Sequence, residues 1–418
     1  MQDTQTEHAE AEPVRETHTT TCCIVGAGPG GAMLAILLAR QGVPVVLLEA
    51  HLDFDREFRG DTLHPAILEI LDEIGLAKRL HQLPHVKLYG PTFATATGPF
   101  TPFDFHRLRT RFPYIMFMHQ PIFLEFLTEE SKKFPEFRLV MGANVQRLCE
   151  SDGVVQGVRY RATDGWHEVR AVLTVGADGR FSRTRHLAGF EPVATSRPVE
   201  LVWFRLPRLP GDPPNLAGAF PRQSQGRLMA VVGRADHYQL AYFIPLGQYP
   251  ALRAAGLDAF RRSVGELEPG LARNAAHLTD WHELSLLSVA SSRCRRWYKP
   301  GLLLIGDAAH TMTPAAGAGI KYAIEDAVVA ANLLAKPLKE GHVELSDLAK
   351  VQRQREWPTR FIQALGAFAV KHVINPALRP GKDLRFPRVV RLMFRIPLVR
   401  DLAARLVAFG FWRVHVKT

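Results

Sequence analysis

Residues Thr21–Ala50 read TCCIVGAGPGGAMLAILLARQGVPVVLLEA, and this stretch decides the fold. It contains, in order, an apolar run, a glycine-rich turn, an Ala/Leu-rich segment and a second apolar run that ends in an acid: Cys22–Val25, Gly26–Gly31, Ala32–Arg40, Val43–Leu48 and Glu49. Short apolar runs beside glycine predict buried strands, and the Ala/Leu-rich segment between them predicts a helix. The order therefore predicts a strand-helix-strand unit of a parallel sheet.

The glycines of this unit have the spacing Gly26-x-Gly28-x-x-Gly31, which is typical of a dinucleotide-binding turn. Gly26 permits the tight turn after the strand, Gly28 leaves room for a pyrophosphate, and Gly31 lets the helix pack closely on the strand. The N–H groups at the start of the helix attract phosphate. Glu49 ends the second strand, where a carboxylate accepts hydrogen bonds from ribose hydroxyls. The motif alone does not separate NAD from FAD.

Length and composition indicate a globular chain of two domains or one elaborate domain. The chain has 418 residues, 47% of them apolar, and no apolar run reaches the length of a membrane-spanning helix. Residues 1–19 are polar and predict a disordered tail without a secretory or transit signal. The four cysteines, Cys22, Cys23, Cys149 and Cys294, lack metal-binding spacing. We therefore expect no metal and a reduced, cytoplasmic setting.

Positive charge is concentrated near the C-terminus. The formal net charge is +11, and residues 384–418 carry eight Lys/Arg against one acid, Asp401, with apolar residues interleaved. Such a stretch predicts either a peripheral contact with an anionic membrane or a pair of helices packed on the body with solvated arginines. No nucleic-acid module is visible, so we do not expect a nucleic-acid partner.

A second motif lies in the sequence AVLTVGADGRFSRTR, residues Ala171–Arg185. An apolar strand runs into a tight turn and then into the start of a helix. Asp178 is placed to accept hydrogen bonds there, and Ser182 and Arg185 are expected to face a gap of phosphate size. An ordinary strand-to-helix turn is the alternative.

A third motif lies in GLLLIGDAAHTMTPAAGAGIKYAIEDAVVAA, residues Gly301–Ala331. An apolar strand ends at Gly306 and Asp307, and a Pro/Gly/Ala loop leads into a helix that begins near Gly319. Asp307 is placed to bind a polyol chain, and the small residues of the loop let backbone N–H groups approach a flat ligand. A buried aspartate that caps a turn is the alternative.

In this order, the three motifs resemble the FAD-dependent aromatic-ring hydroxylases, the group A flavoprotein monooxygenases that include 4-hydroxybenzoate hydroxylase. The resemblance covers roughly residues 20–360. It implies that Glu49 binds the adenosine ribose and Asp307 the ribityl chain, and that the helix near Gly319 points at the flavin pyrimidine. Looser matches at Arg59–Leu63 and His119–Pro121 add two residues, so that the implied FAD contacts are Gly26, Gly28, Gly30, Gly31, Glu49, Ala50, Arg59, Gln120, Asp178, Gly306, Asp307, Pro314, Gly317, Gly319 and Ile320.

The chain departs from the family pattern at Lys321, which stands where the family has Asn. A cation beside the flavin pyrimidine would favour the anionic reduced flavin. The alternative is a side chain that points into solvent.

We therefore expect an α/β fold: a Rossmann-like FAD-binding domain of the GxGxxG type, an inserted α+β substrate domain and a helical C-terminal extension. Alternating runs predict strands of the substrate sheet at Val199–Leu206, Arg227–Val232 and Tyr238–Ile244. The expected boundaries are 20–90, 120–195 and 285–360 for the FAD domain, 91–119 and 196–284 for the substrate domain, and 361–418 for the basic helical extension.

The resemblance also implies the reaction. NADPH or NADH, bound transiently, would reduce FAD, and a flavin C4a-hydroperoxide would hydroxylate an aromatic, polycyclic or quinone-like small molecule. Catalytic residues cannot be mapped by motif. We expect the pocket between the flavin and the substrate sheet, although strand aromatics also pack in cores. Its candidate lining residues are Trp203, Arg205, Met229, Tyr242, Phe243 and Pro314.

Three alternatives stay open beside the hydroxylase. A flavin halogenase is disfavoured because Leu240–Pro245 lacks the Trp-x-Trp-x-Ile-Pro pattern of that class. A flavin-dependent reductase is disfavoured mildly by His310. A membrane-associated flavoprotein module with little turnover would suit the basic C-terminal stretch. Substrate identity, the choice of nicotinamide and the oligomeric state are not determined by the sequence.

Overall fold

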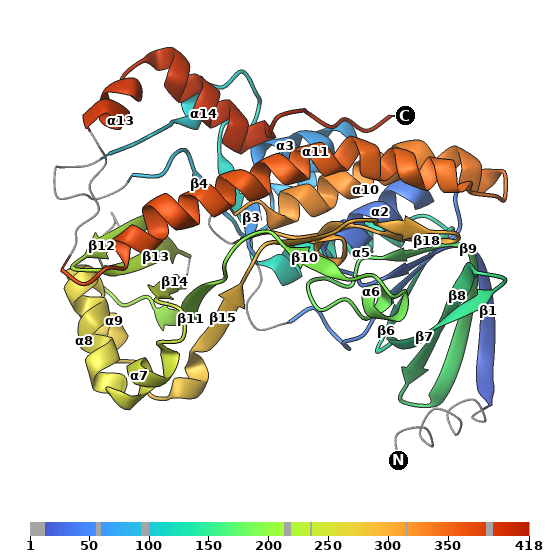
Figure 1. The fold of residues 1–418 in the computed structure, drawn as a ribbon, viewed down its shortest axis with the longest axis horizontal. Helices are drawn as coiled ribbons and strands as arrows, with labels where there is room; N and C mark the ends of the chain where they lie inside the picture. Colours follow the sequence, from blue (N-terminus) through green and yellow to red (C-terminus); the bar gives the residue numbers. More distant parts are fainter. Residues whose placement is uncertain are drawn as a thin grey trace.

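The computed structural model describes residues 13–55, 60–92, 100–212, 219–234, 236–313, 317–381 and 388–417. Figure 1 shows a large α/β body and a smaller body built on a second sheet, with the long helix α11 (Leu345–Ala369) running across both. The C-terminal helices lie beside them. The α/β class, the second sheet and the helical C-terminal region are as the sequence predicts.

The large body is built on an eight-stranded sheet. Its main path is β17 (Tyr298–Lys299), β18 (Leu302–Leu304), β9 (Gly165–Gly176), β1 (Val14–Val25), β2 (Val45–Glu49) and β6 (Phe137–Met141), and the hairpin of β7 (Asn144–Ser151) and β8 (Val154–Ala162) joins through β9. The strands from β18 to β6 are parallel. The strand order reverses at β1, and open α/β sheets bind ligands at the carboxyl ends of the strands at such a point.

The last four residues of strand β1, Cys22–Val25, are buried on both faces. Cys22 and Ile24 pack in the core that includes α2 (Pro29–Ala39) and α10 (Gly319–Lys339), and Cys23 and Val25 pack against the β7–β8 hairpin. A parallel strand covered on both sides reads as a continuous apolar run, as Cys22–Val25 does. The strand-helix-strand unit predicted from this stretch is confirmed.

The N-terminal boundary differs from the prediction. Residues 1–19 were expected to be disordered, and this prediction is wrong for the last six of them. Strand β1 begins at Val14 and pairs with β9 as far as Trp166. The threonines at 17 and 19 favour strand, and the ladder to β9 satisfies the backbone groups of this polar stretch. Residues 1–12 lie outside the described part of the chain.

The smaller body contains a five-stranded antiparallel sheet. Its order is β12 (Ala219–Ser224), β13 (Arg227–Gly233), β14 (His237–Ile244), β11 (Val199–Pro207) and β15 (Ser285–Val289). Helix α8 (Leu257–Leu267) packs on one face through Phe260 and Val264. The predicted boundary at residue 284 is wrong, because β15 pairs with β11, with Leu287 opposite Leu201. Apolar spacing inside a strand does not reveal which sheet it joins. The segment 91–119 was also expected in the substrate domain, but its residues Met116 and Met118 pack in the core of the large body, so this boundary is wrong.

Helix α11 also crosses a predicted boundary. It runs from Leu345 through residue 361, where the extension was expected to start, and continues as a π-helical turn, Val370–Ile374. Its first half packs on the large body through Leu348, and Val370 and Ile374 pack on the second sheet. One continuous helix therefore ties the two bodies together (Figure 1).

The C-terminal extension contains α13 (Arg388–Met393) and α14 (Pro397–Phe409). Ala404, Ala408 and Phe409 of α14 are buried beside Phe105 and Ile115. The packed-helix alternative is therefore correct for this face of α14. Over the described residues, no helix combines the length and apolarity needed to cross a membrane.

Candidate active site

The three sequence motifs meet at the carboxyl ends of the central strands. Gly26 has φ +100°, and a Cβ on it would lie 2.6 Å from the Cα of Asp178. The turn with Asp178 and Gly179 (the DG motif) is joined to the turn Gly306–His310 (the GDAAH turn), because Arg185 Nη1 donates to the carbonyl oxygen of Ala308 at 3.1 Å. Three segments far apart in the sequence thus form one continuous edge.

Small residues let two helices begin side by side at this edge. A Cβ on Gly30 would lie 3.1 Å from the carbonyl oxygen of Ala323, and a Cβ on Gly306 would lie 2.9 Å from the Cβ of Ala323. Helices α2 and α10 start after Gly28 and Ala318, and neither has a side-chain cap or an acid in its first turn. Both N-termini therefore direct backbone N–H groups and a partial positive charge to the same edge.

The glycine turn fits a pyrophosphate. A Cβ on Gly28 would meet nothing nearer than the carbonyl oxygen of Ala177 at 4.0 Å, so the turn is open on this side. By contrast, a Cβ on Gly31 would lie 2.0 Å from the carbonyl oxygen of Gly26, so Gly31 is required by the packing of helix on strand. The open side of Gly28 is the cradle that a phosphate needs.

Glu49 is fixed by two backbone donors. Its carboxylate accepts from the N–H of Ala27 and the N–H of His51, each at 3.0 Å, and it is 3% exposed. This position, at the end of the second strand, is the one where an acid accepts hydrogen bonds from ribose hydroxyls in dinucleotide-binding folds. Ala50 follows at the exposed end of β2.

Asp307 lies at the start of α10, as the motif predicts. Its Oδ1 is 4.0 Å from the position of a Cβ on Gly319, and the residue is half-buried. Gly317, with φ +57°, lies in the loop just before α10, and its carbonyl oxygen accepts from Thr62 Oγ1 at 2.9 Å. Two residues implied as FAD contacts, Arg59 and Pro314, lie outside the described residues.

The DG motif holds structure together rather than facing an open gap. Asp178 accepts from Ser182 Oγ at 2.5 Å and from the N–H of Thr184 at 2.8 Å, at the start of α6 (Arg183–Leu187). The expectation that Ser182 and Arg185 face a phosphate-sized gap is wrong. Arg185 instead donates to carbonyl oxygens of the two turns, at Arg180, Asp307 and Ala308, which need donors because these residues are partly or fully buried.

A buried charge network supports the GDAAH turn. Asp326 accepts from the N–H of Gly306 at 3.0 Å, from His310 Nε2 at 2.7 Å and from Arg355 Nε at 2.7 Å, and Arg355 Nη2 also donates to Glu325 at 2.8 Å. Burial raises the pKa of Asp326, but His310 and Arg355 offset this, so that its pKa is lowered. Sequence reasoning missed this network, although two adjacent acids in an otherwise apolar helix were a visible signal.

Lys321 is buried, so the solvent-facing alternative is wrong. The side chain is 2% exposed, and its Nζ lies 5.3 Å from the centre of the Tyr322 ring. A Cβ on Gly410, directly after α14, would lie 2.9 Å from the same Nζ. Burial lowers the pKa of Lys321, partly offset by Glu325. The side chain therefore faces the C-terminal extension.

Gln120 joins the two loose motif matches. Its Nε2 donates to the carbonyl oxygen of Gly60 at 3.0 Å, and its backbone N–H donates to Asp61 Oδ1 at 3.2 Å. A Cβ on Gly60 would lie 3.6 Å from the Cδ1 of Ile320, so this group adjoins the start of α10. Asp61 was not singled out from the sequence, because a single acid in a loop carries no pattern.

Strand alternation divides the six pocket candidates. The prediction that Met229 and Tyr242 line the pocket is wrong, because they are paired across β13 and β14 and pack in the core under α8. Trp203, Arg205 and Phe243 occupy the opposite face, and Arg205 Nη2 lies 3.3 Å from His119 Nε2 of the large body. Pro314 lies outside the described residues. The face that meets the large body is therefore the one with Trp203 and Arg205.

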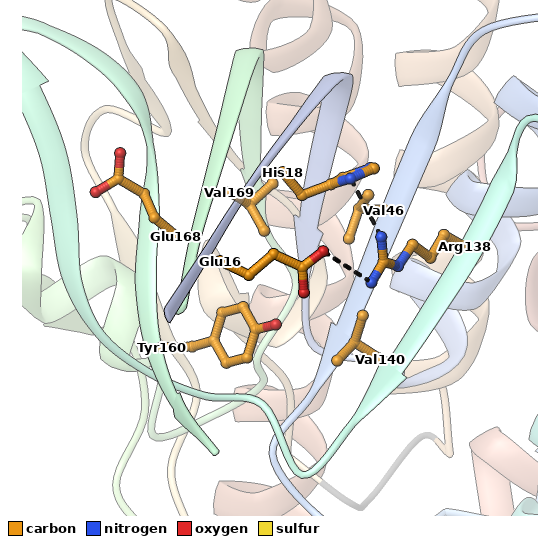
Figure 2. A pocket seen from close by; sticks show the side chains of 8 residues that line it. All are labelled: Glu16, His18, Val46, Arg138, Val140, Tyr160, Glu168 and Val169. Atoms are coloured by element: carbon orange, nitrogen blue, oxygen red, sulfur yellow. Dashed lines mark hydrogen bonds and ion pairs between the residues drawn. The ribbon is translucent and has the colours of Figure 1, made fainter. Parts of the chain in front are cut away.

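Figure 2 shows a small pocket elsewhere, near the amino ends of the strands of the large sheet. Arg138 lies across it, 3.2 Å from His18 Nδ1 and 3.9 Å from Glu16 Oε1. The glycine turns are at the carboxyl ends of the same strands, so this pocket is separate from the site described above.

The family described as FAD binding domain matches residues 19–359. A 6-methylpretetramide 4-monooxygenase from Streptomyces rimosus is 30% identical over 414 residues, which cover 97% of this chain and 96% of that protein. A rifampicin monooxygenase from Streptomyces venezuelae is 28% identical over 323 residues, and the match spans 73% of this chain but 61% of that protein.

A solved structure shows the same architecture. An anhydrotetracycline hydroxylase from Streptomyces rimosus superposes with a TM-score of 0.71 and 25% sequence identity, covering 93% of this chain and 76% of that one.

Proposed function

This chain belongs to the FAD binding domain family and is an FAD-dependent monooxygenase, and we propose that it uses NADPH or NADH and dioxygen to hydroxylate an aromatic, polycyclic or quinone-like molecule. The observation that carries the proposal is the meeting of two uncapped helix N-termini with the motif turns at one sheet edge. The similarity to a monooxygenase over nearly the whole of both chains supports the same reaction class.

The residues that would hold FAD follow from this geometry. The start of α2 at Gly28 would bind the pyrophosphate, Glu49 the adenosine ribose and Asp307 the ribityl chain. The start of α10 would stabilise negative charge at the pyrimidine edge. Bound FAD would accept a hydride from the nicotinamide and activate dioxygen, so that one oxygen atom enters the substrate and the other leaves as water.

The second sheet would supply the substrate side. Trp203, Arg205 and Phe243 occupy the face that meets the large body, so they can orient a flat molecule and exclude water from it. The polycyclic substrates in the names of two relatives support a pocket for fused rings.

The experiment that tests the proposal measures NADPH and NADH oxidation and oxygen uptake by the FAD-loaded protein with phenols, quinones and polycyclic aromatics, with mass spectrometry of the products. We expect a substrate that stimulates both rates and gains the mass of one oxygen atom. Flavin reduction without oxygen insertion would favour a reductase, and halide incorporation would favour a halogenase. Either result would overturn the hydroxylase proposal.

A further inference from the structure

Polar side chains gather where the second sheet meets the large body. Arg205 on β11 is paired in register with Gln239 on β14, and both lie on the face opposite the α8 core. Arg234 follows β13, and its guanidinium reaches Asp61 of the large body. We call this region, with Asp61, His119, Arg205, Arg234 and Gln239, the seam.

The acid of the seam is already neutralised. Asp61 is paired with Arg234 at 2.5 Å, and these two side chains are 9% and 10% exposed. Asp61 also accepts from the N–H of Gln120 at 3.2 Å. With its amide oriented to satisfy both neighbours, Gln239 donates to Asp61 Oδ2 at 3.3 Å and accepts from Trp203 Nε1. These contacts leave Asp61 fully engaged within the seam.

Arg205 is in a different position. It is exposed, its Nη2 lies 3.3 Å from His119 Nε2, and across the described ranges no carboxylate lies within 4.0 Å of it. A guanidinium has five donors, and a neutral imidazole can accept only one of them. The guanidinium of Arg205 therefore has donors that His119 does not use. Arg205 is two residues along β11 from Trp203, so the two side chains share a face of the sheet.

Beside the seam, this sheet face has an apolar stretch. Trp203 is opposite Ala241, and Phe243 is opposite Leu228. Leu228 is buried with Val370 of the π-helical turn, which closes that end of the face. The face is therefore basic at one end and has an apolar stretch beside it, with Ser285 next to Trp203 and Gln223 next to Leu228 as polar neighbours.

We propose that Arg205 and His119 form an oxyanion subsite that binds the ionised phenol or enol oxygen of a polycyclic substrate, whose rings lie along the apolar part of the face. The assignment rests on the proposed function, and it narrows the substrate class to ring systems with an acidic hydroxyl. Arg205 donates to the oxygen, and His119, which precedes Gln120 on the large body, fixes the guanidinium. The seam thereby orients the bound substrate.

The test compares two probes that differ in one ionisable group: 2-hydroxy-1,4-naphthoquinone and 2-methoxy-1,4-naphthoquinone. Calorimetric titration of the FAD-loaded full chain is done at a pH where the hydroxyl is ionised. We expect the wild-type protein to bind the hydroxy probe about tenfold or more tightly than the methoxy probe, as a charge-assisted hydrogen bond would give. Arg205→Gln should remove this preference, and Arg205→Lys should keep part of it because it keeps the charge.

Arg227→Gln is the matched control. Arg227 is on the same sheet, but its side chain lies on the face opposite the seam and pairs with Glu266 at 2.6 Å. Its loss should therefore leave the preference for the hydroxy probe unchanged. FAD content and the thermal midpoint of each variant show that the fold is intact. No preference in the wild-type protein, no binding of either probe, or a full preference in Arg205→Gln would each overturn the subsite.

Binding is independent of turnover, so the two proposals can fail separately. If the protein prefers the hydroxy probe through Arg205 but oxygenates no molecule of the panel, the subsite proposal stands and the hydroxylase proposal is rejected. If it oxygenates neutral aromatics but binds both probes equally, the hydroxylase proposal stands and the subsite proposal is rejected.

Discussion

Asp307 is the residue that tests the flavin site most directly. Its carboxylate lies at the start of α10, where a ribityl hydroxyl would find an acceptor. We expect Asp307→Ala to weaken FAD binding roughly tenfold to hundredfold, the effect of losing a hydrogen bond to a charged group worth about 1.5–3 kcal/mol. FAD retained after gel filtration measures this. Asp258→Ala, an exposed acid on α8, is the control, and unchanged occupancy in Asp307→Ala would refute the ribityl contact.

His64 is the second residue that gives a testable prediction, because its ring contacts two segments that lie far from each other in the sequence. Its Nε2 lies 3.1 Å from the carbonyl oxygen of Gly317, and its Nδ1 lies 3.0 Å from that of Val407 in α14. Burial, with Lys321 nearby, lowers the pKa of His64 to about 4. An unfolded histidine titrates near pH 6.5, so below that pH only the unfolded chain takes up the proton. Stability from this residue is therefore present above about pH 6.5 and is lost as the pH falls towards 4.

We expect His64→Gln to show a weaker loss of stability on acidification than the wild-type protein. The difference between pH 7 and pH 4 should approach roughly 3 kcal/mol, the equivalent of the pKa change. Urea unfolding at several pH values measures it, with His282→Gln, which removes an exposed histidine, as the control. Parallel pH curves for wild-type and His64→Gln proteins would contradict the assignment.

At the scale of elements, α10 and α11 are joined by charges as well as by apolar packing. Arg355 on α11 is 1% exposed and pairs with both Glu325 and Asp326 on α10. Removing one partner of a buried pair leaves the other charge uncompensated, which costs about 3–5 kcal/mol. We expect Arg355→Met to lower the free energy of unfolding by that amount and to reduce FAD occupancy, because Asp326 supports the turn at Gly306.

Denaturant unfolding and flavin absorbance after desalting measure the two effects. Arg353→Met changes an exposed residue of the same helix and should alter neither. An Arg355→Met protein with wild-type stability would show that the network contributes nothing net.

For the whole molecule, the extension has a buried face and an open face. Ala404, Ala408 and Phe409 are buried, while Leu398 and Leu402 are 76% and 65% exposed beside basic residues. The predicted contact with an anionic membrane stays a prediction, and it would use this open face. Deleting α14 would uncover the apolar surface beneath it, so surface substitutions are the sharper test.

We expect the wild-type chain to sediment with phosphatidylglycerol vesicles more than a Leu398→Ser, Leu402→Ser double variant does, and neither to sediment with phosphatidylcholine vesicles. Ala404 lies on the buried face and stays unchanged in both proteins, which keeps the packing the same. Equal sedimentation of the two proteins would remove the membrane contact.

The sequence by itself determined the features that depend on contiguous residues. The run Thr21–Ala50 predicts a strand, a glycine turn and a helix because apolar periodicity and glycine placement act over a few residues. The order of the three motifs was enough to place Gly28, Glu49 and Asp307 at one edge, because a parallel sheet brings the carboxyl ends of its strands together.

Only the tertiary structure decided which residues face each other across long separations. The sequence marked Trp203 and Tyr242 equally as pocket residues, but the sheet register puts them on opposite faces. It gave no sign that Arg234 would neutralise Asp61, or that Arg355 would enter the core beside Asp326. Strand propensity and helix periodicity describe one segment at a time. Sheet register and charge pairing depend on which segments meet, and the packing of the whole chain settles that.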